Sequence, residues 1–389
     1  MSGPANLSHS ASGTCALLEV YDQIPVRPVR GEGVFLYTAE GERYLDFYGG
    51  HAVAALGYAH PALVAALEQQ ARTLFFQSNL VPLEVRNRAA EALVGFAPPG
   101  LSRVFFVNSG AEANENALRI AFRTTGRPRV VAVEGAFHGR TAAAGAVTAG
   151  HQRWYGFPGE PFNVSWVPFD DVAALEGAMA DDVAAMILEP VQGVAGARAL
   201  SASFLRAARE TATAAGAVLI FDEVQCGMGR TGWPFAAQAF GVQPDVLTTA
   251  KGLGGGFPVG AVLVGEALAS RLGKGDLGTT FGGGPLAMAL VETVVRTIEA
   301  EGLLARVRRL SARLRNECVA GPVSAVQGMG FLVGLRTVPP AREVLRRLRE
   351  KKILAGGAAD PNIVRLLPPL VLEDVHVDEL VEALKEISA

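Results

Sequence analysis

The chain has 389 residues, of which 50% are hydrophobic and 19% are charged, and its formal net charge is −3. This composition excludes an intrinsically disordered chain, and the length is typical of two to three domains. The balanced charge argues against nucleic acid and anionic membranes as partners, and no apolar run is long enough to predict a transmembrane helix.

Targeting and redox signals in the sequence are weak. The cysteines Cys15, Cys226 and Cys318 are scattered and fit neither a metal site nor a disulfide framework. The first basic residue is Arg27, which is untypical of a signal peptide. We therefore expect a cytoplasmic protein without a metal site. Residues 1–14 are rich in Ser, Ala and Gly and predict a flexible N-terminal segment.

The first hundred residues predict a small β element followed by two helices. Two short strands are expected over Gly31 to Tyr37 and Gly41 to Phe47, with a turn between them. Apolar residues at helical spacing, with Pro in the first turn, predict helices over Pro61 to Leu74 and Pro82 to Phe96.

After Pro98-Pro99-Gly100 the pattern alternates between strands and helices. Such alternation predicts an α/β fold, in which helices cover both faces of a mostly parallel sheet. The expected elements are strands at Arg103–Val107, Arg129–Val133, Ala184–Leu188 and Ala217–Phe221, and helices at Ala113–Arg123 and Phe204–Ala215.

Helices dominate again from Leu286 onward, with strand candidates at Val323–Leu335 and Ile363–Leu367. We expect a large domain of residues 51–275. Residues 15–50 and 276–389 are expected to form a smaller α+β domain beside it.

The stretch from Ala217 to Lys251 carries the clearest chemical signal. One apolar strand runs into Asp222, and a second, Val246-Leu247, leads to Lys251 and then to a loop too glycine-rich for a helix. Ligands of open α/β sheets bind beyond the carboxyl ends of the strands, so both side chains can act on one molecule. A lysine amine suits the aldehyde of pyridoxal 5'-phosphate (PLP), and a carboxylate suits its ring nitrogen. Alternatively, Asp222 caps the next segment and Lys251 is a solvated surface residue.

Three further motifs bear on this choice. The motif from Asn108 to Asn114 follows a strand and opens a helix, and Ser109 and Glu112 have capping-box spacing. Backbone N–H groups of Gly110 and Ala111 would then be free to hold a phosphate. Taken alone this signal is weak, because most capped helix starts bind nothing.

The second motif is Phe137-His138-Gly139-Arg140, and the third is the glycine-rich loop that contains Thr279 and Thr280. An aromatic ring at a strand end can stack on a flat cofactor, and an arginine can bind a carboxylate through two hydrogen bonds. Each residue also has a plainer interpretation: Phe137 as core, Arg140 as surface and the loop as a simple connection.

Together the motifs resemble those of class III, PLP-dependent aminotransferases over roughly Tyr21 to Leu370. The resemblance is closest to the branch that acts on acetylornithine. It rests on the following runs, in the order and spacing of that family: Tyr48-Gly49-Gly50-His51-Ala52-Val53, Asn108-Ser109-Gly110-Ala111-Glu112-Ala113-Asn114, Phe137-His138-Gly139-Arg140-Thr141, Asp222-Glu223-Val224-Gln225, Gly227-Met228-Gly229-Arg230-Thr231-Gly232, Ala250-Lys251-Gly252 and Thr279-Thr280-Phe281-Gly282-Gly283.

The resemblance implies a fold-type I transferase that works as a homodimer with shared active sites. Lys251 would bond to the PLP aldehyde and later move the proton between the substrate carbon and the cofactor, and Asp222 would pair with the ring nitrogen. The other cofactor-binding residues that it implies are Gly110 and Ala111 at the phosphate, Phe137 on the ring, Gln225 near the ring hydroxyl and Thr280 from the neighbouring subunit.

For the substrates, the resemblance implies that Arg140 and Thr279 bind the distal carboxylate and that Tyr21 also touches substrate. Arg365 matches the arginine that grips the α-carboxylate of 2-oxoglutarate. One departure is Val194, which stands where many family members have a glutamate that covers this arginine. The acyl group of the amine donor is therefore left open.

The predicted function is transfer of the terminal amine of N-acetylornithine, or a similar N-acyl ornithine, to 2-oxoglutarate. The products are the semialdehyde and glutamate, a step of arginine biosynthesis. An alternative is another class III ω-aminotransferase, acting on N-succinylornithine, acyl-lysine, ornithine or 4-aminobutyrate. A remote alternative is a non-catalytic, Rossmann-like binding protein, but Gly252 to Phe257 lacks the third glycine of a dinucleotide fingerprint.

Overall fold

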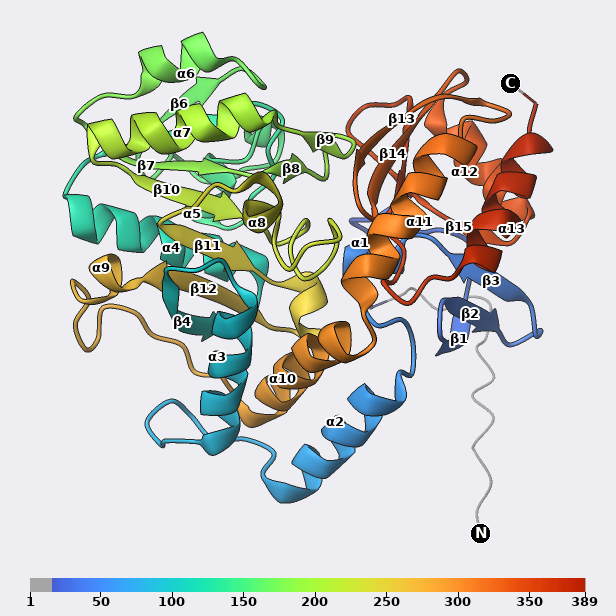
Figure 1. The fold of residues 1–389 in the computed structure, drawn as a ribbon, viewed down its shortest axis with the longest axis horizontal. Helices are drawn as coiled ribbons and strands as arrows, with labels where there is room; N and C mark the ends of the chain where they lie inside the picture. Colours follow the sequence, from blue (N-terminus) through green and yellow to red (C-terminus); the bar gives the residue numbers. More distant parts are fainter. Residues whose placement is uncertain (1–15, 389) are drawn as a thin grey trace.

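The computed structural model describes residues 16–388. It has a larger body built on a seven-stranded sheet and a smaller body that carries two four-stranded sheets (Figure 1). The predicted flexible segment, residues 1–14, lies outside the described residues. Within the described part of the chain, no helix is long and apolar enough to cross a membrane.

The seven-stranded sheet confirms the predicted α/β class. Its strand order is β4-β12-β11-β10-β7-β5-β6, and all neighbours from β11 to β6 are parallel. Only β12 runs against its two neighbours, β11 and β4. Two of its strands, β6 and β12, were not predicted from the sequence. The seven strands are β4 (Leu101–Val107), β5 (Arg129–Val133), β6 (Asn163–Val167), β7 (Val183–Leu188), β10 (Val218–Asp222), β11 (Val246–Thr249) and β12 (Gly260–Gly265).

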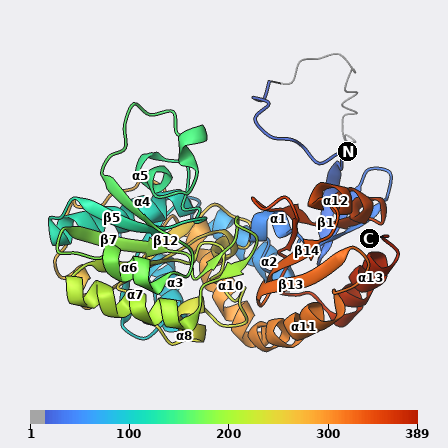
Figure 2. The ribbon, with the colours of Figure 1, turned by 90° about the horizontal axis from the view of Figure 1, so that it is seen from above.

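Strand β10 shows why the sequences of the central strands are continuous apolar runs: both of its faces are buried. Leu219 and Phe221 face the core under helix α7 (Ala202–Ala215), whereas Val218 and Ile220 face helix α4 (Gly110–Thr125) on the opposite side. Helices thus cover both faces, as Figure 2 shows from above. Burying each of these large side chains stabilises the fold by roughly 1.5–3 kcal/mol.

The smaller body draws strands from both ends of the chain. One sheet contains β1 (Pro28–Glu32), β2 (Phe35–Thr38), β3 (Arg43–Asp46) and β15 (Ile353–Leu354). The other contains β13 (Val323–Met329), β14 (Leu332–Thr337), β17 (Ile363–Leu366) and β16 (Gly356–Gly357). The domain boundaries given above remain a prediction.

Two predicted strands are broken by turns. Gly31 to Tyr37 was expected as one strand, but the chain turns at Gly33, which has a φ of +57°. Val323 to Leu335 likewise forms a hairpin that turns at Gly330, where φ is +58°. Glycine adopts this backbone conformation without a steric penalty, so both strands end there.

Helix α10 (Pro285–Ala300) packs against α2 (Pro61–Thr73) and against α3 (Glu84–Phe96), below the sheet in Figure 1. The buried Arg230 joins the larger body to the smaller one, because its guanidinium donates to the carbonyl groups of Pro368 and Phe331. The remaining elements are α1 (Gly49–Ala52), α5 (Ala142–Ala146), α6 (Val172–Ala178), α8 (Ala236–Phe240), α9 (Glu266–Ala269), α11 (Leu303–Glu317), α12 (Ala341–Glu350), α13 (Asp374–Lys385), β8 (Val191–Gln192), β9 (Arg198–Ala199) and the 3₁₀ turns His151–Arg153 and Lys251–Gly254.

Candidate functional site

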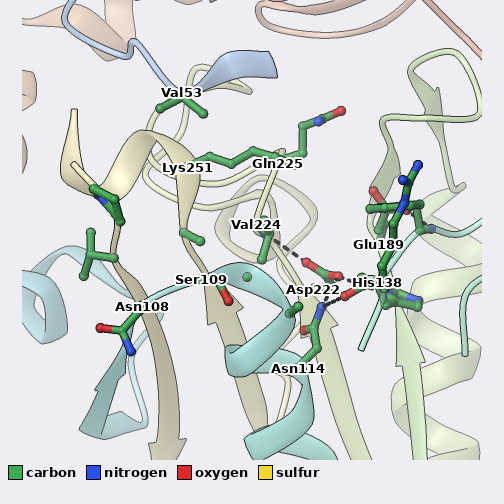
Figure 3. Close-up of a pocket in the computed structure, with 18 of the residues that line it drawn as sticks. Val53, Asn108, Ser109, Asn114, His138, Glu189, Asp222, Val224, Gln225 and Lys251 are labelled. Atoms are coloured by element: carbon green, nitrogen blue, oxygen red, sulfur yellow. Dashed lines mark hydrogen bonds and ion pairs between the residues drawn. The ribbon is translucent and has the colours of Figure 1, made fainter. Parts of the chain in front are cut away.

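A cavity of about 450 Å³ lies at the carboxyl ends of β10 and β11, beside the start of α4 (Figure 3). Its volume suits a small ligand. Parallel strands place their carboxyl ends at one edge, which is why residues far apart in sequence meet there. Seven predicted site residues line this cavity: Gly110, Ala111, Phe137, Arg140, Asp222, Gln225 and Lys251.

Asp222 is the last residue of β10 and is 2% exposed. Its Oδ1 accepts a hydrogen bond from the Val224 N–H at 3.0 Å. Its Oδ2 accepts from Asn114 Nδ2 at 2.7 Å and faces His138 Nδ1 at 2.7 Å. Three donors around one buried carboxylate stabilise its negative charge. The site therefore holds a fixed anion at the end of the central strand.

Lys251 lies just beyond β11 and is half-buried. The loop predicted after it is instead a 3₁₀ turn, Lys251–Gly254, since one turn needs few helix formers and Gly255 ends it at a φ of +59°. Lys251 itself has a φ of +46°, which is uncommon for a residue with a side chain and typical of strained functional positions.

The amine of Lys251 is prepared for chemistry by its surroundings. Desolvation lowers the pKa of Lys251 below its ordinary value, although nearby Asp222 and Glu189 partly oppose this. A lower pKa increases the neutral fraction of the amine near pH 7, and only the neutral amine is a nucleophile or a base. Lys251 is half-buried at the cavity, so it is not a fully solvated surface lysine.

The start of α4 has the geometry of an anion site. The Ser109 hydroxyl caps the helix by accepting from the Glu112 N–H at 3.1 Å, as predicted. Glu112 reaches back to the Asn108 N–H at 2.6 Å. The backbone N–H groups of Gly110 and Ala111, the first two residues of α4, have no acceptor within the helix. Both residues line the cavity, where the helix dipole favours negative charge.

Glu189 supports the loop that carries Phe137. Its Oε1 accepts from the Phe137 N–H at 2.8 Å and its Oε2 from the Gly193 N–H at 3.1 Å. Burial, reinforced by the charge of Asp222, raises the pKa of Glu189 to about 7. Arg140 lines the same cavity, exposed, with its guanidinium 5.6 Å from the ring centre of Trp154.

Arg365 approaches the cavity from β17 of the smaller body and is 5% exposed. Its Nε donates to the Gly357 carbonyl at 2.6 Å, and its Nη1 donates to Gln225 Oε1 at 3.4 Å. Gln225 thus stands between Arg365 and the cavity, which Gln225 lines. Burial lowers the pKa of Arg365, and both oxygen partners are uncharged.

Apart from Arg365, which Gln225 separates from the cavity, three predicted site residues do not line it in this single chain. Thr279 is half-buried and its hydroxyl accepts from the Gly282 N–H at 3.1 Å, and Thr280 is exposed. Tyr21 is 74% exposed, in the segment before β1 that extends away from the body (Figure 2). Residues 16–27, the described part of that segment, contain no helix or strand. The roles of these three residues stay predictions.

Asn114 and His138 lie within the sequence motifs, but no role was predicted for them or for Thr248. All three are at most 2% exposed and belong to the hydrogen-bond network of Asp222. A signal was present for Asn114, because it shares a buried helical face with Ala117 and Leu118, where a polar residue needs a partner. Among residues 16–388, no group of acidic, His and Cys side chains is placed to hold a metal ion.

Comparison with known proteins gives one consistent family. A family model described as Aminotransferase class-III matches residues 18–388. The chain is 44% identical to the acetylornithine aminotransferase of Mycolicibacterium smegmatis and 39% identical to that of Methanocaldococcus jannaschii, with 95% of each chain covered in both cases.

Solved structures agree. The acetylornithine aminotransferase of Elizabethkingia anophelis aligns with a TM-score of 0.82 and 30% identity, covering 95% of both chains. An ornithine aminotransferase of Toxoplasma gondii, described with partial occupancy of PLP at its active site, aligns with a TM-score of 0.88 and 29% identity, covering 95% of this chain and 91% of the other.

Proposed function

Since this chain belongs to the class III aminotransferases, which depend on PLP, we propose that it transfers the terminal amine of N-acetylornithine, or of a similar N-acyl ornithine, to 2-oxoglutarate. The products are the semialdehyde and glutamate, in arginine biosynthesis. The donor is supported by the names of relatives that match over 95% of the chain. The observation that carries the chemistry is one cavity lined by both a strained Lys251 and the buried Asp222.

The residues at this cavity fit PLP. Gly110 is needed where it stands, because a Cβ there would lie 2.7 Å from Val224 Cγ1, so only a residue without a side chain lets the start of α4 pack this close to the turn after β10. Gly110 and Ala111 would hold the phosphate by their N–H groups, Asp222 the ring nitrogen, and Phe137 one face of the ring. When bound, PLP supplies an electron-withdrawing ring that stabilises negative charge on the substrate carbon.

Lys251 and Asp222 would divide the proton chemistry. With its lowered pKa, Lys251 Nζ can accept a proton from the substrate carbon near neutral pH and return it on the other side of the reaction. Asp222, whose negative charge three donors stabilise, would keep a proton on the ring nitrogen of bound PLP. One group moves the proton and the other fixes a charge.

Two arginines would select the substrates. Arg140 is exposed at the cavity and suits the carboxylate at the far end of an N-acyl ornithine, and Thr279, which does not line this cavity in the single chain, would assist it. Arg365 is buried and suits the α-carboxylate of 2-oxoglutarate, once it leaves Gln225. A planar guanidinium binds a carboxylate through two parallel hydrogen bonds, and this favours acids over neutral analogues.

We also propose a homodimer. Large apolar side chains are exposed on the segments around residues 75–81 and 281: Phe75 is 68% exposed, Leu80 93% and Phe281 65%. The Phe76 and Phe281 rings lie 5.3 Å apart, which joins both segments into one patch. Exposed apolar patches commonly mark protein interfaces. A second copy on this patch would bring Thr280, which precedes Phe281, to the neighbouring cavity. A cytoplasmic location remains part of the proposal and rests on the scattered cysteines.

A half-reaction tests the donor. The PLP-loaded protein is mixed with N-acetylornithine without any oxoacid, and the absorbance of the bound cofactor is followed. We expect conversion to the amine form of the cofactor with formation of the semialdehyde, and far slower conversion in the Lys251→Ala variant. Conversion with ornithine or 4-aminobutyrate but with neither N-acetylornithine nor N-succinylornithine would refute an N-acyl ornithine as donor, and conversion with N-succinylornithine alone would refute the acetyl group. A protein that binds no PLP would support the non-catalytic alternative.

A further inference from the structure

The network around Asp222 extends beyond the residues that the proposed function uses. Asn114 Nδ2, from α4, donates to Asp222 Oδ2 at 2.7 Å and also to the His138 carbonyl at 2.7 Å. His138 Nδ1, from the loop after β5, lies 2.7 Å from the same Oδ2 (Figure 3). All three side chains are at most 2% exposed. Helix α4 and the loop after β5 therefore both hold the side-chain carboxylate of Asp222, the last residue of β10.

Thr248 fixes which way the Asn114 amide points. The Thr248 hydroxyl lies 2.7 Å from Asn114 Oδ1 and donates to it. On the other side of the amide, Asn114 faces two acceptors, the Asp222 carboxylate and the His138 carbonyl, so its NH₂ group must lie there. A flipped amide would set oxygen against oxygen, hence only one orientation satisfies the network.

The surroundings of His138 also select its protonation state. Nδ1 faces an ionised carboxylate and therefore carries a hydrogen. Nε2 is buried and, within residues 16–388, has no hydrogen-bond partner. A charged imidazolium would leave an N–H at Nε2 buried and unpaired, which is far less favourable than a bare lone pair. The neutral form with hydrogen on Nδ1 fits this site.

The two carboxylate oxygens of Asp222 face different numbers of hydrogen-bond donors. Oδ2 has two side-chain donors, whereas Oδ1 has, among the residues that the structure describes, only the Val224 N–H at 3.0 Å. Each carboxylate oxygen accepts about two hydrogen bonds, so Oδ2 is saturated and Oδ1 keeps one acceptor site. We propose that Asn114 and His138 are positioning residues that hold Asp222 ionised, with Oδ1 presented to the ring nitrogen of PLP.

This inference rests on the proposed function, and it is tested by cofactor binding without any substrate. The matched pair is His138→Asn and His138→Leu, which have nearly the same shape, but only Asn offers a nitrogen donor near the position of Nδ1. Cofactor-free protein is titrated with PLP, and the dissociation constant and the absorbance spectrum are recorded.

We expect His138→Leu to weaken PLP binding about tenfold, the scale of one lost hydrogen bond to a charged group, and to change the spectrum of the bound cofactor. His138→Asn should stay within about threefold of the original protein and keep its spectrum, because the donor is kept. The control is His151→Leu. His151 is also buried and paired with a carboxylate, Glu160 at 2.7 Å, but it does not line the cavity. This variant should lose stability and keep the PLP dissociation constant.

Equal losses in both His138 variants would show that shape alone matters and would overturn the inference, as would unchanged binding in both. If His138→Leu does not fold, Thr248→Val replaces it, since it removes only the hydroxyl that orients Asn114. About threefold weaker PLP binding supports the inference, and unchanged binding contradicts it. Failure of N-acetylornithine as donor would leave these binding results as they are, so the two proposals fail separately.

The tautomer has its own readout. In cofactor-free protein labelled with ¹⁵N-histidine, the ring signals that disappear in His138→Asn belong to His138. They should show a hydrogen on Nδ1 and none on Nε2. An imidazolium, or hydrogen on Nε2 alone, would contradict the inference.

Discussion

At the scale of single residues, the site is a set of charges whose surroundings have been arranged before any ligand arrives. Lys251 is strained and partly desolvated, Asp222 is held by three donors, and Arg365 is buried with uncharged partners. Ionisable groups perturbed in this way gather at active sites more than elsewhere. Their roles can be separated by substitutions that change one property at a time.

Replacing Lys251 by Ala removes the only proton carrier that we assign. We expect the rate of the half-reaction to fall by about 10²–10⁴-fold or more, the range for losing general acid–base catalysis. The measurement is the single-turnover rate with N-acetylornithine. Lys274→Ala changes an exposed lysine and should leave that rate unchanged. A Lys251→Ala variant with nearly full activity would rule out the assignment.

Glu189 predicts how stability depends on pH. Its folded-state pKa of about 7 lies above its ordinary value, so between about pH 4.5 and 7 the folded state binds a proton that the unfolded state lacks. Stability is therefore higher at the acid end of this window and falls as the pH rises through 7.

In cofactor-free Glu189→Gln, the fall in melting temperature between pH 5 and 7 should be smaller than in the original protein. Burial also raises the pKa of Glu223 to about 7, so part of the slope should remain in this variant. The exposed Glu91→Gln serves as control and should keep the full slope. An identical slope in Glu189→Gln and the original protein would contradict the assignment.

At the scale of elements, strand ends and one helix start do the positioning. Asp222 ends β10, Lys251 follows β11, and the register of this parallel pair places Asp222 opposite Thr248. Helix α4 begins at the same edge of the sheet with two free N–H groups. The cavity therefore depends on how closely α4 approaches the turn after β10.

Gly110→Ala tests that approach. The added Cβ would meet Val224 at 2.7 Å, so α4 or the turn must shift, and we expect PLP binding to weaken about tenfold, as when a helix-end anion contact is disturbed. Gly95→Ala is the matched control, because it is also a helical glycine and its Cβ would meet nothing within 4 Å. It should gain up to about 1 kcal/mol of stability with unchanged binding. Unaltered PLP affinity in Gly110→Ala would argue against a phosphate site there.

At the scale of the whole molecule, the exposed apolar patch around Leu80 and Phe281 suggests that one chain is not the complete enzyme. The double variant Leu80→Asp and Phe281→Asp should shift the protein toward monomers in sedimentation, since desolvating a charge at an interface is unfavourable. Aminotransferase activity should fall as the dimer is lost, because Thr280 would no longer reach the neighbouring cavity. Val338→Asp, at an exposed apolar residue away from the patch, is the control. A dimer that survives the double substitution would refute this interface.

Much of this molecule could be predicted from sequence because its signals are local. Apolar runs predicted the central strands, and the spacing of Ser109 and Glu112 predicted the cap of α4. The antiparallel strand β12 was missed, since its apolar run does not reveal the direction in which it pairs. The partners of Asp222 were missed for a related reason: Asn114, His138 and Thr248 meet it only through tertiary contacts.

The measurement that tests the central claim most directly is chemical trapping of the cofactor. The PLP-loaded protein is reduced with borohydride, digested and mapped by mass spectrometry. We predict that the cofactor mass is found on the peptide containing Lys251. Attachment to Lys274, Lys351, Lys352 or Lys385 instead, or no attachment at all, would contradict the assignment of this cavity as the active site.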